Sequence, residues 1–83
     1  MNWTLLVAKP ARKALGKLPD RDQVRIEQAL DQLERDPFSG DIKRLKPPGW
    51  RRRVGNYRIF YDIFPDERRI VVTAIERRTS TTY

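Results

Sequence analysis

Arginines crowd one short stretch of this chain, from Trp50 to Arg58, and they limit the chemistry that the sequence can support. A guanidinium group stays charged at any relevant pH, and its planar fork of donors suits bidentate contact with phosphate and stabilisation of a phosphorane-like transition state. The sequence contains no histidine and no cysteine. This removes the commonest general base, the usual transition-metal ligands and any Ser-His or Cys-His nucleophile pair. We therefore expect binding of an anion and electrostatic catalysis, with no metal and no other cofactor.

The overall charge predicts a polyanionic partner. Lys and Arg number 18 against 11 Asp and Glu, which gives a net charge of +7 and a pI near 10.4. A domain this basic favours RNA or DNA as a partner, and an acidic protein segment next. A cationic surface without any ligand is the alternative. No stretch approaches the ~20 apolar residues of a membrane span, and the N-terminus lacks the pattern of a secretory signal. We therefore expect a cytoplasmic protein with no membrane partner.

The first half of the chain predicts one strand followed by two helices. Residues 3–8 form a short apolar run of strand formers, which Lys9-Pro10 ends. Apolar residues then recur at helical spacing in two stripes, Ala11, Ala14, Leu15 and Leu18, and Ile26, Ala29, Leu30 and Leu33. Asp20 and Gln23 resemble a capping box at the start of the second helix.

The second half predicts three strands. A loop at 36–41 and an irregular basic connection at 42–49 come first, and then the hydrophobic period changes to two. The expected strands are 50–54, 57–64 and 69–75, joined by a tight turn at Gly55-Asn56 and a loop at 65–68. We expect a single α+β domain over residues 1–83, in the order β-α-α-β-β-β. Its helical hairpin should pack on one face of a small, mainly antiparallel sheet.

The tight turn decides which face of the sheet carries the arginines. With that turn, Arg53 lies opposite Arg58 and Arg51 lies on the same face. Like charges directly opposite each other destabilise a hairpin, so this arrangement invites an anion that neutralises them. Arginines that are merely solvated are the alternative. A slip of one residue in the register would instead turn Arg52 outward and bury Arg51 and Arg53.

The last hairpin should bring further groups to the same face. Its expected register pairs Phe64 with Arg69 and Arg58 with Ile75, which places Arg77 and Arg78 beside the other arginines. The apolar residues expected on this face are Phe60, Phe64, Val71 and Ile75. Apolar side chains beside a cationic cluster predict a peptide partner that supplies hydrophobic anchors and carboxylates. Alternatively, the segment 42–49 folds back over them.

Several stretches resemble one known family. The run from Trp50 to Tyr61 is similar to the R-x-R-V-G-x-Y-R-hydrophobic-hydrophobic-Y stretch of RelE-type toxins, and residues 75–78 resemble the basic end of that family's closing strand. Residues 11–19 and 29–37 resemble its two helical motifs, so the resemblance covers essentially the whole chain. The sequence is thereby identified as a member of the RelE/ParE superfamily of type II toxin–antitoxin toxins, in the RelE-like branch.

The resemblance implies a ribosome-dependent, metal-independent endoribonuclease, in which the RNA 2′-hydroxyl attacks the adjacent phosphate. The implied partners are the ribosome, messenger RNA and a cognate antitoxin, with operator DNA bound only through the antitoxin complex. A ParE-like inhibitor of DNA gyrase and a catalytically inert binding member of the same fold are the alternatives. Either alternative would need no catalytic residues.

The resemblance also assigns roles to residues of this chain. Arg58 and Arg78 match two catalytic arginines of the family, and Tyr83 is the candidate for its C-terminal tyrosine. Arg51 and Arg53 stand where the best-studied branch has lysines. Since a guanidinium is a poor general base, we expect these two arginines, together with Arg77, to bind phosphate rather than to accept protons.

Overall fold

The computed structural model describes residues 3–77, which form a five-stranded sheet and two α-helices. The elements are β1 (Thr4–Val7), α1 (Lys9–Gly16), α2 (Asp20–Arg35), β2 (Ile42–Arg44), β3 (Gly49–Val54), β4 (Tyr57–Phe64), a 3₁₀ turn (Pro65–Glu67) and β5 (Arg69–Arg77). The sheet order is β1-β5-β4-β3-β2, with β1 parallel to β5 and the other pairs antiparallel. The predicted α+β class and element order are confirmed, with β2 as an additional strand.

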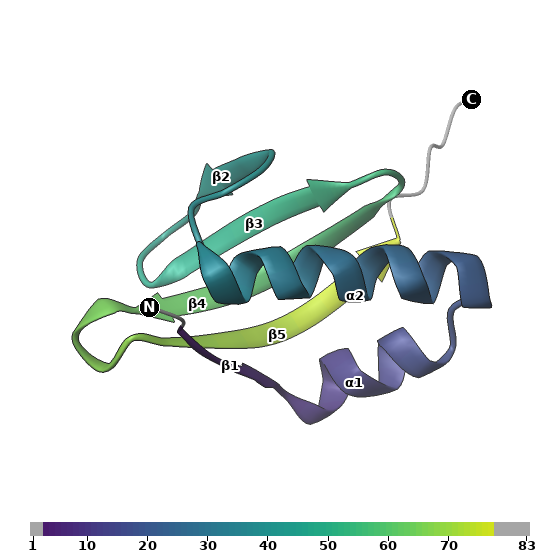
Figure 1. Cartoon of the computed structure of the whole chain (residues 1–83), viewed down its shortest axis with the longest axis horizontal. Coiled ribbons are helices and arrows are strands. Elements are labelled where there is room, and N and C mark those ends of the chain that lie inside the picture. Colours follow the sequence, from purple (N-terminus) through teal and green to yellow (C-terminus); the bar gives the residue numbers. More distant parts are fainter. Residues whose placement is uncertain (1–2, 78–83) are drawn as a thin grey trace.

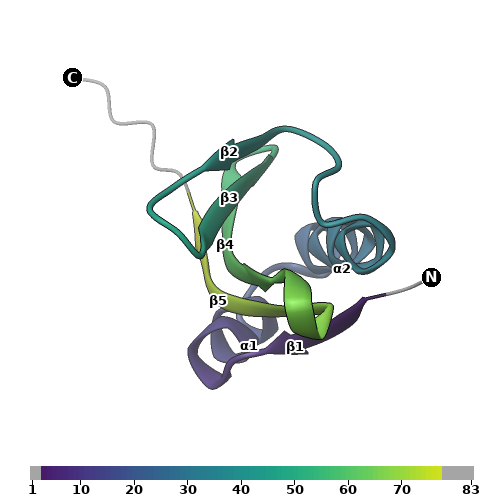
Figure 2. The ribbon, with the colours of Figure 1, turned by 90° about the vertical axis from the view of Figure 1, so that its left-hand side faces the viewer.

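The helices cover one face of the sheet and form a core with it. In Figure 1, α2 crosses in front of the strands and α1 lies beside it, and Figure 2 shows α2 in the hollow of the curved sheet. Both predicted helical stripes face this core. Its buried residues are Ala11, Ile26, Ala29, Leu30, Leu33, Tyr57, Ile59, Tyr61, Ile63, Ile70, Val72 and Ile75. Between residues 3 and 77, neither helix is long and apolar enough to cross a membrane.

The predicted capping box at the start of α2 is wrong. Pro19 occupies the N-cap position, and no side chain caps the helix there. Instead, Nε2 of Gln23 donates to the backbone oxygen of Leu15, at 2.9 Å, and so ties α2 to the end of α1. Asp20 and Asp22 still stabilise the start of α2, because their negative charges lie at the positive end of the helix dipole.

The basic connection before β3 contains the short strand that was not predicted. Ile42 lies opposite Arg52 and Arg44 lies opposite Trp50, so β2 extends the sheet beyond β3. Further along, the backbone N–H of Leu45 donates to the oxygen of Gly49 and closes the loop between the two strands. A strand of 3 residues is too short for an alternating pattern to be recognised in the sequence.

An irregularity in the last hairpin changes which β5 side chains share a face with β4. Phe64 lies opposite Arg69, as predicted. Between Phe60 and Tyr61 the register shifts, because β5 carries one extra residue there. Side chains alternate between the two faces of a strand, so the β5 residues beyond this β-bulge lie on the face opposite to the predicted one.

Candidate functional site

Arg51, Arg53 and Arg58 lie together on the open face of the sheet, away from α2. We refer to these residues as the arginine cluster. Arg53 lies opposite Arg58 and Arg51 lies opposite Phe60, which confirms the register predicted from the tight turn. Lys43 of β2 lies opposite Arg51 and adds a further cation to the same row. Arg53 is exposed, whereas Arg51 and Arg58 are half-buried.

Two buried donors of the arginine cluster have no hydrogen-bond partner among residues 3–77. The Nε atoms of Arg51 and Arg58 are buried, and neither has a hydrogen-bond acceptor among residues 3–77. Glu76 lies opposite Arg58 on β5, but the one ion pair found in the described part of the chain joins Arg69 to Glu67, at 2.8 Å. Buried donors are normally satisfied. An anion with several acceptor oxygens, such as a phosphate, would complement the positive charge of this row.

A buried arginine between two members of the cluster fixes the register of β3. Arg52 is 9% exposed and points to the helix side. Its Nη2 donates to Oε1 of Gln32 and its Nη1 donates to Oγ of Ser39, at 3.4 Å. Burial lowers the pKa of Arg52. Gly40 (φ 81°) leaves room for the guanidinium, because a Cβ there would lie 2.7 Å from Cζ of Arg52. The slipped register that would turn Arg52 outward is therefore wrong.

The tip of the β3–β4 hairpin is also anchored to α2. Gly55 has a φ of 58°, and a Cβ at this position would lie 2.9 Å from Nη1 of Arg25. The Tyr57 hydroxyl donates to Oδ2 of Asp22, at 2.6 Å. This hydrogen bond, together with burial, raises the pKa of Tyr57. These contacts hold the hairpin whose other face carries the arginine cluster.

Because of the β-bulge, two predicted site residues lie on the helix side of the sheet and not on the open face. Ile75 lies opposite Ile59 and is 6% exposed, so it belongs to the core and does not bind a partner on the open face. Arg77 lies opposite Tyr57 on the helix side. The prediction that Arg77 joins the arginine cluster is therefore wrong, and so is the predicted pairing of Ile75 with Arg58.

The open face also carries apolar side chains that are at least partly exposed. Phe60, Phe64 and Val71 lie there half-buried, at the positions predicted for them. Leu6 of β1 lies opposite Val71 and is 49% exposed. We refer to these four residues as the apolar patch. Sequence reasoning missed Leu6, because nothing in the sequence shows which strand pairs with β1.

The remaining groups that could transfer a proton are divided between the two faces. Arg78 and Tyr83, predicted as catalytic residues, lie outside the described residues. Tyr61 is buried on the helix side, where burial raises its pKa to about 12. Glu76, by contrast, is exposed beside Arg58 on the open face. Sequence reasoning missed Glu76, since the unbulged register placed it on the opposite face.

Comparison with known proteins identifies the family. The family described as the ParE toxin of type II toxin–antitoxin systems matches residues 3–81. The chain belongs to the RelE/ParE toxin superfamily. This toxin is 30% identical to a protein of Methanocaldococcus jannaschii named as a toxin, RelE1, over 94% of this chain and 92% of that protein.

Solved structures support the same assignment. The RelE–RelB complex of Pyrococcus horikoshii contains a chain with a TM-score of 0.86 and 25% identity, covering 98% of the toxin and 100% of that chain. The toxin–antitoxin complex RelBE2 of Mycobacterium tuberculosis contains one with a TM-score of 0.83 and 26% identity, covering 94% and 100%. The toxin therefore shares the RelE fold along nearly its whole length.

Proposed function

We propose that this toxin is a ribosome-dependent endoribonuclease that cleaves translated messenger RNA in the cytoplasm without a metal ion. The observation that supports this function is the arginine cluster, whose buried Nε atoms have no acceptor among residues 3–77. A phosphodiester would supply acceptor oxygens to the guanidinium groups of the cluster. Guanidinium groups bind its oxygens in a bidentate manner, and such charge-assisted hydrogen bonds are about twice as strong as neutral ones.

The proposed reaction is attack of the RNA 2′-oxygen on the adjacent phosphorus. The O2′–P bond forms while the P–O5′ bond breaks, leaving a 2′,3′-cyclic phosphate and a free 5′-hydroxyl. Arg51 and Arg53 hold the phosphate, and Arg58 stabilises the charge that develops on its oxygens. Removing one such preorganised donor from an enzyme typically lowers the rate by a factor of about 10²–10³. The arginines thus act by alignment and electrostatics rather than as bases.

Glu76 is the group that we assign to accept the proton of the 2′-hydroxyl. It is exposed on the open face, directly across from Arg58. Carboxylates are among the side chains that act as general bases, whereas the buried tyrosines lie on the helix side of the sheet. The leaving 5′-oxygen takes its proton from water. Arg78 and Tyr83 remain part of the proposed site.

A cognate antitoxin is the proposed protein partner. The solved relatives from Pyrococcus horikoshii and Mycobacterium tuberculosis are complexes of toxin with antitoxin. On this toxin, antitoxin carboxylates would neutralise the arginine cluster and its apolar side chains would cover the apolar patch. Such binding blocks access of RNA to the open face. Operator DNA is bound only through this complex.

Inhibition of DNA gyrase is the second candidate function. It is favoured by the family match, which carries the ParE name. A gyrase inhibitor acts by binding alone, so it needs no proton acceptor and no preorganised phosphate site. A catalytically inert member that binds the antitoxin or nucleic acid is the third candidate.

Mapping the 5′ ends of messenger RNA after induced expression distinguishes these candidates. Wild-type toxin should produce new ends inside translated codons, in phase with the reading frame. The double variant Arg51→Ala, Arg58→Ala should produce none. The matched control Arg21→Ala, Arg35→Ala removes the same charge from exposed positions of α2 and should cleave like wild type. Glu76→Gln should reduce cleavage about 10²-fold or more, as expected for loss of a general base.

Two other outcomes would contradict the ribonuclease function. Growth arrest with DNA-damage signalling and no new ends would assign the toxin to gyrase inhibition. Absence of any growth effect would indicate the third candidate, a catalytically inert binding protein. Cleavage that persists in the double variant would show that the arginine cluster is not the site.

A further inference from the structure

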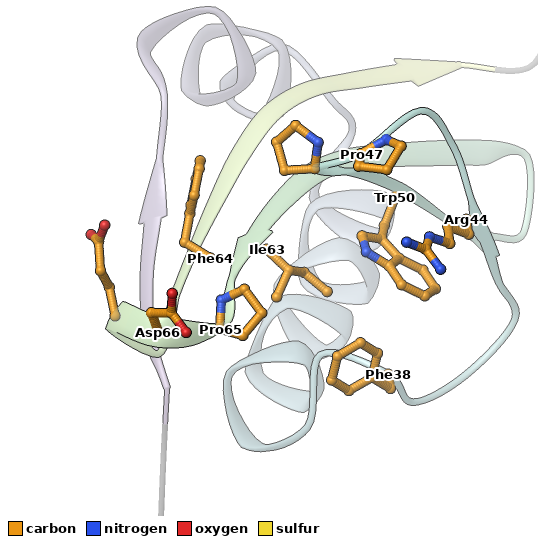
Figure 3. A pocket seen from close by; sticks show the side chains of 10 residues that line it. Phe38, Arg44, Pro47, Trp50, Ile63, Phe64, Pro65 and Asp66 are labelled. Carbon is orange, nitrogen blue, oxygen red and sulfur yellow. The ribbon is translucent and has the colours of Figure 1, made fainter.

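An open cavity of about 540 Å³ lies at one end of the sheet, between the β2–β3 loop and the 3₁₀ turn after β4 (Figure 3). Its lining residues are Phe38, Arg44, Pro47, Pro48, Trp50, Ile63, Phe64, Pro65, Asp66 and Glu67. The volume lies in the range of about 300–1,000 Å³ that is usual for ligand pockets. No member of the arginine cluster lines this pocket, so it is separate from the proposed cleavage site.

The walls of the pocket are mainly apolar, and one aromatic side chain among them is exposed to solvent. The ring centroids of Phe38 and Trp50 are 5.4 Å apart at an angle of 77°, so the two rings meet edge to face. Figure 3 shows them on one side of the pocket, with Phe64 and Pro65 on the other. Phe38 remains 48% exposed. A large apolar side chain that remains exposed to solvent beside an apolar pocket indicates a site that an apolar partner covers.

The charges at the mouth favour a polypeptide over RNA. Arg44 lies beside Trp50, whereas Asp66 lies at the other side, on the 3₁₀ turn that also contains Glu67. Glu67 is paired with Arg69, but Asp66 has no ion pair within residues 3–77. An RNA backbone would meet these carboxylates with like charge. A peptide that inserts an apolar side chain and carries a neighbouring Lys or Arg would complement both the walls and Asp66.

The pocket is also continuous with the surface to which the antitoxin is assigned. Phe64 lines the pocket and belongs to the apolar patch on the open face. A chain that crosses the patch therefore reaches the edge of the pocket at Phe64, passing Asp62, which lies opposite Val71 on the same face.

We infer that this pocket receives an apolar anchor side chain of the cognate antitoxin, and that Asp66 pairs with a basic residue next to the anchor. The inference rests on the antitoxin partner included in the proposed function, but not on RNA cleavage. It divides the antitoxin into two chemically different parts. An acidic segment neutralises the arginine cluster, and an apolar segment with a basic neighbour fills the pocket.

The first test measures binding of the full-length toxin to the antitoxin encoded beside it. Each toxin is produced together with the antitoxin, so that cells tolerate it, and is separated from the antitoxin before the measurement. Phe38→Ala and Asp66→Lys should each weaken binding by about 10-fold or more, the effect expected of an interface anchor. The control Val24→Ala removes an equally exposed apolar side chain from α2, where Val24 is 52% exposed. The control Asp31→Lys makes the same charge change on the exposed side of α2.

Both controls should bind within about 2-fold of the parent, well below the tenfold effect that corresponds to 1.4 kcal/mol. Equal affinities for the pocket variants and their controls would overturn the inference. Because the measurement reads binding only, it is independent of whether the toxin cleaves RNA. Thermal unfolding of each variant verifies that the fold is intact.

A second test identifies the occupant directly. A photo-reactive benzoylphenylalanine at position 38 should crosslink, in the purified complex, to an apolar antitoxin segment that contains a Lys or Arg. Crosslinks from position 38 to a second toxin copy or to RNA would overturn the inference, and so would the absence of any antitoxin crosslink. The same probe at position 24 should give no antitoxin product.

Discussion

Replacing Arg53 and Arg58 by threonine, singly and together, measures the electrostatic repulsion between these two side chains on the open face. The two residues lie directly opposite each other on β3 and β4. Two unit charges about 6 Å apart repel each other by about 0.7 kcal/mol in water, and directly opposed strand residues typically interact by about 0.2–1 kcal/mol. Arg53 is exposed, so solvent screens part of this repulsion. We therefore expect a repulsive coupling of about 0.5 kcal/mol.

The assay is a double-mutant cycle on the free energy of unfolding, measured without antitoxin. The first threonine should remove the repulsion, whereas the second should not stabilise the protein by that amount again. A coupling of about 0.5 kcal/mol corresponds to about 2–4 °C in melting temperature for a domain of this size. In 1 M salt the coupling should nearly vanish, because the screening length falls to about 3 Å.

A coupling of zero or an attractive coupling at low salt would refute the reasoning. It would mean that the arginines of the cluster do not repel one another, so that a bound anion would relieve no repulsion. The cycle cancels the separate contribution of Glu76 to Arg58, because that contribution is present on both sides of the comparison.

Two further changes test the scaffold behind the site. Gly40→Ala should destabilise the toxin by about 1–3 kcal/mol in denaturant unfolding, because its φ of 81° is strained for alanine and the Cβ meets Arg52. Gly16→Ala, where nothing lies within 4 Å, should be neutral or stabilising, and equal effects at both positions would contradict this account. Since the pKa of Tyr61 is raised from 10 to about 12, stability should be intact below pH 10 and should fall between pH 10 and 12, where only the unfolded state ionises. Tyr61→Phe should flatten that slope in unfolding curves; an unchanged slope would assign it to other groups.

The strand register of the site could be predicted from the sequence because its signals are local. The Gly55-Asn56 turn and the alternation of the flanking strands specify which arginines lie opposite one another, and the structure has this register. The apolar stripes of the two helices could be predicted from the sequence in the same way. In each case the decisive residues lie within a few positions of one another.

Other features depend on geometry that no short pattern records. The β-bulge adds one residue without a glycine or proline to mark it, and this moved Ile75 and Arg77 to the other face and brought Glu76 beside Arg58. The partner of β1 is set by the packing of the whole sheet, so Leu6 could not be placed. The pocket is assembled from three separate segments of the chain, and its shape follows from the fold alone.

The parallel pairing of β1 with β5 also has a consequence for how the toxin is made. It joins the first and last strands of the described chain, so Thr4 finds its partner Arg69 only after all the strands between them have been synthesised. Contacts between such distant residues form late, and the sheet stays incomplete until β5 has left the ribosome. β5 is also the neighbour that completes β4, which carries Arg58. Until β5 pairs with both β4 and β1, the strand that carries Arg58 therefore lacks one of its two neighbours in the sheet.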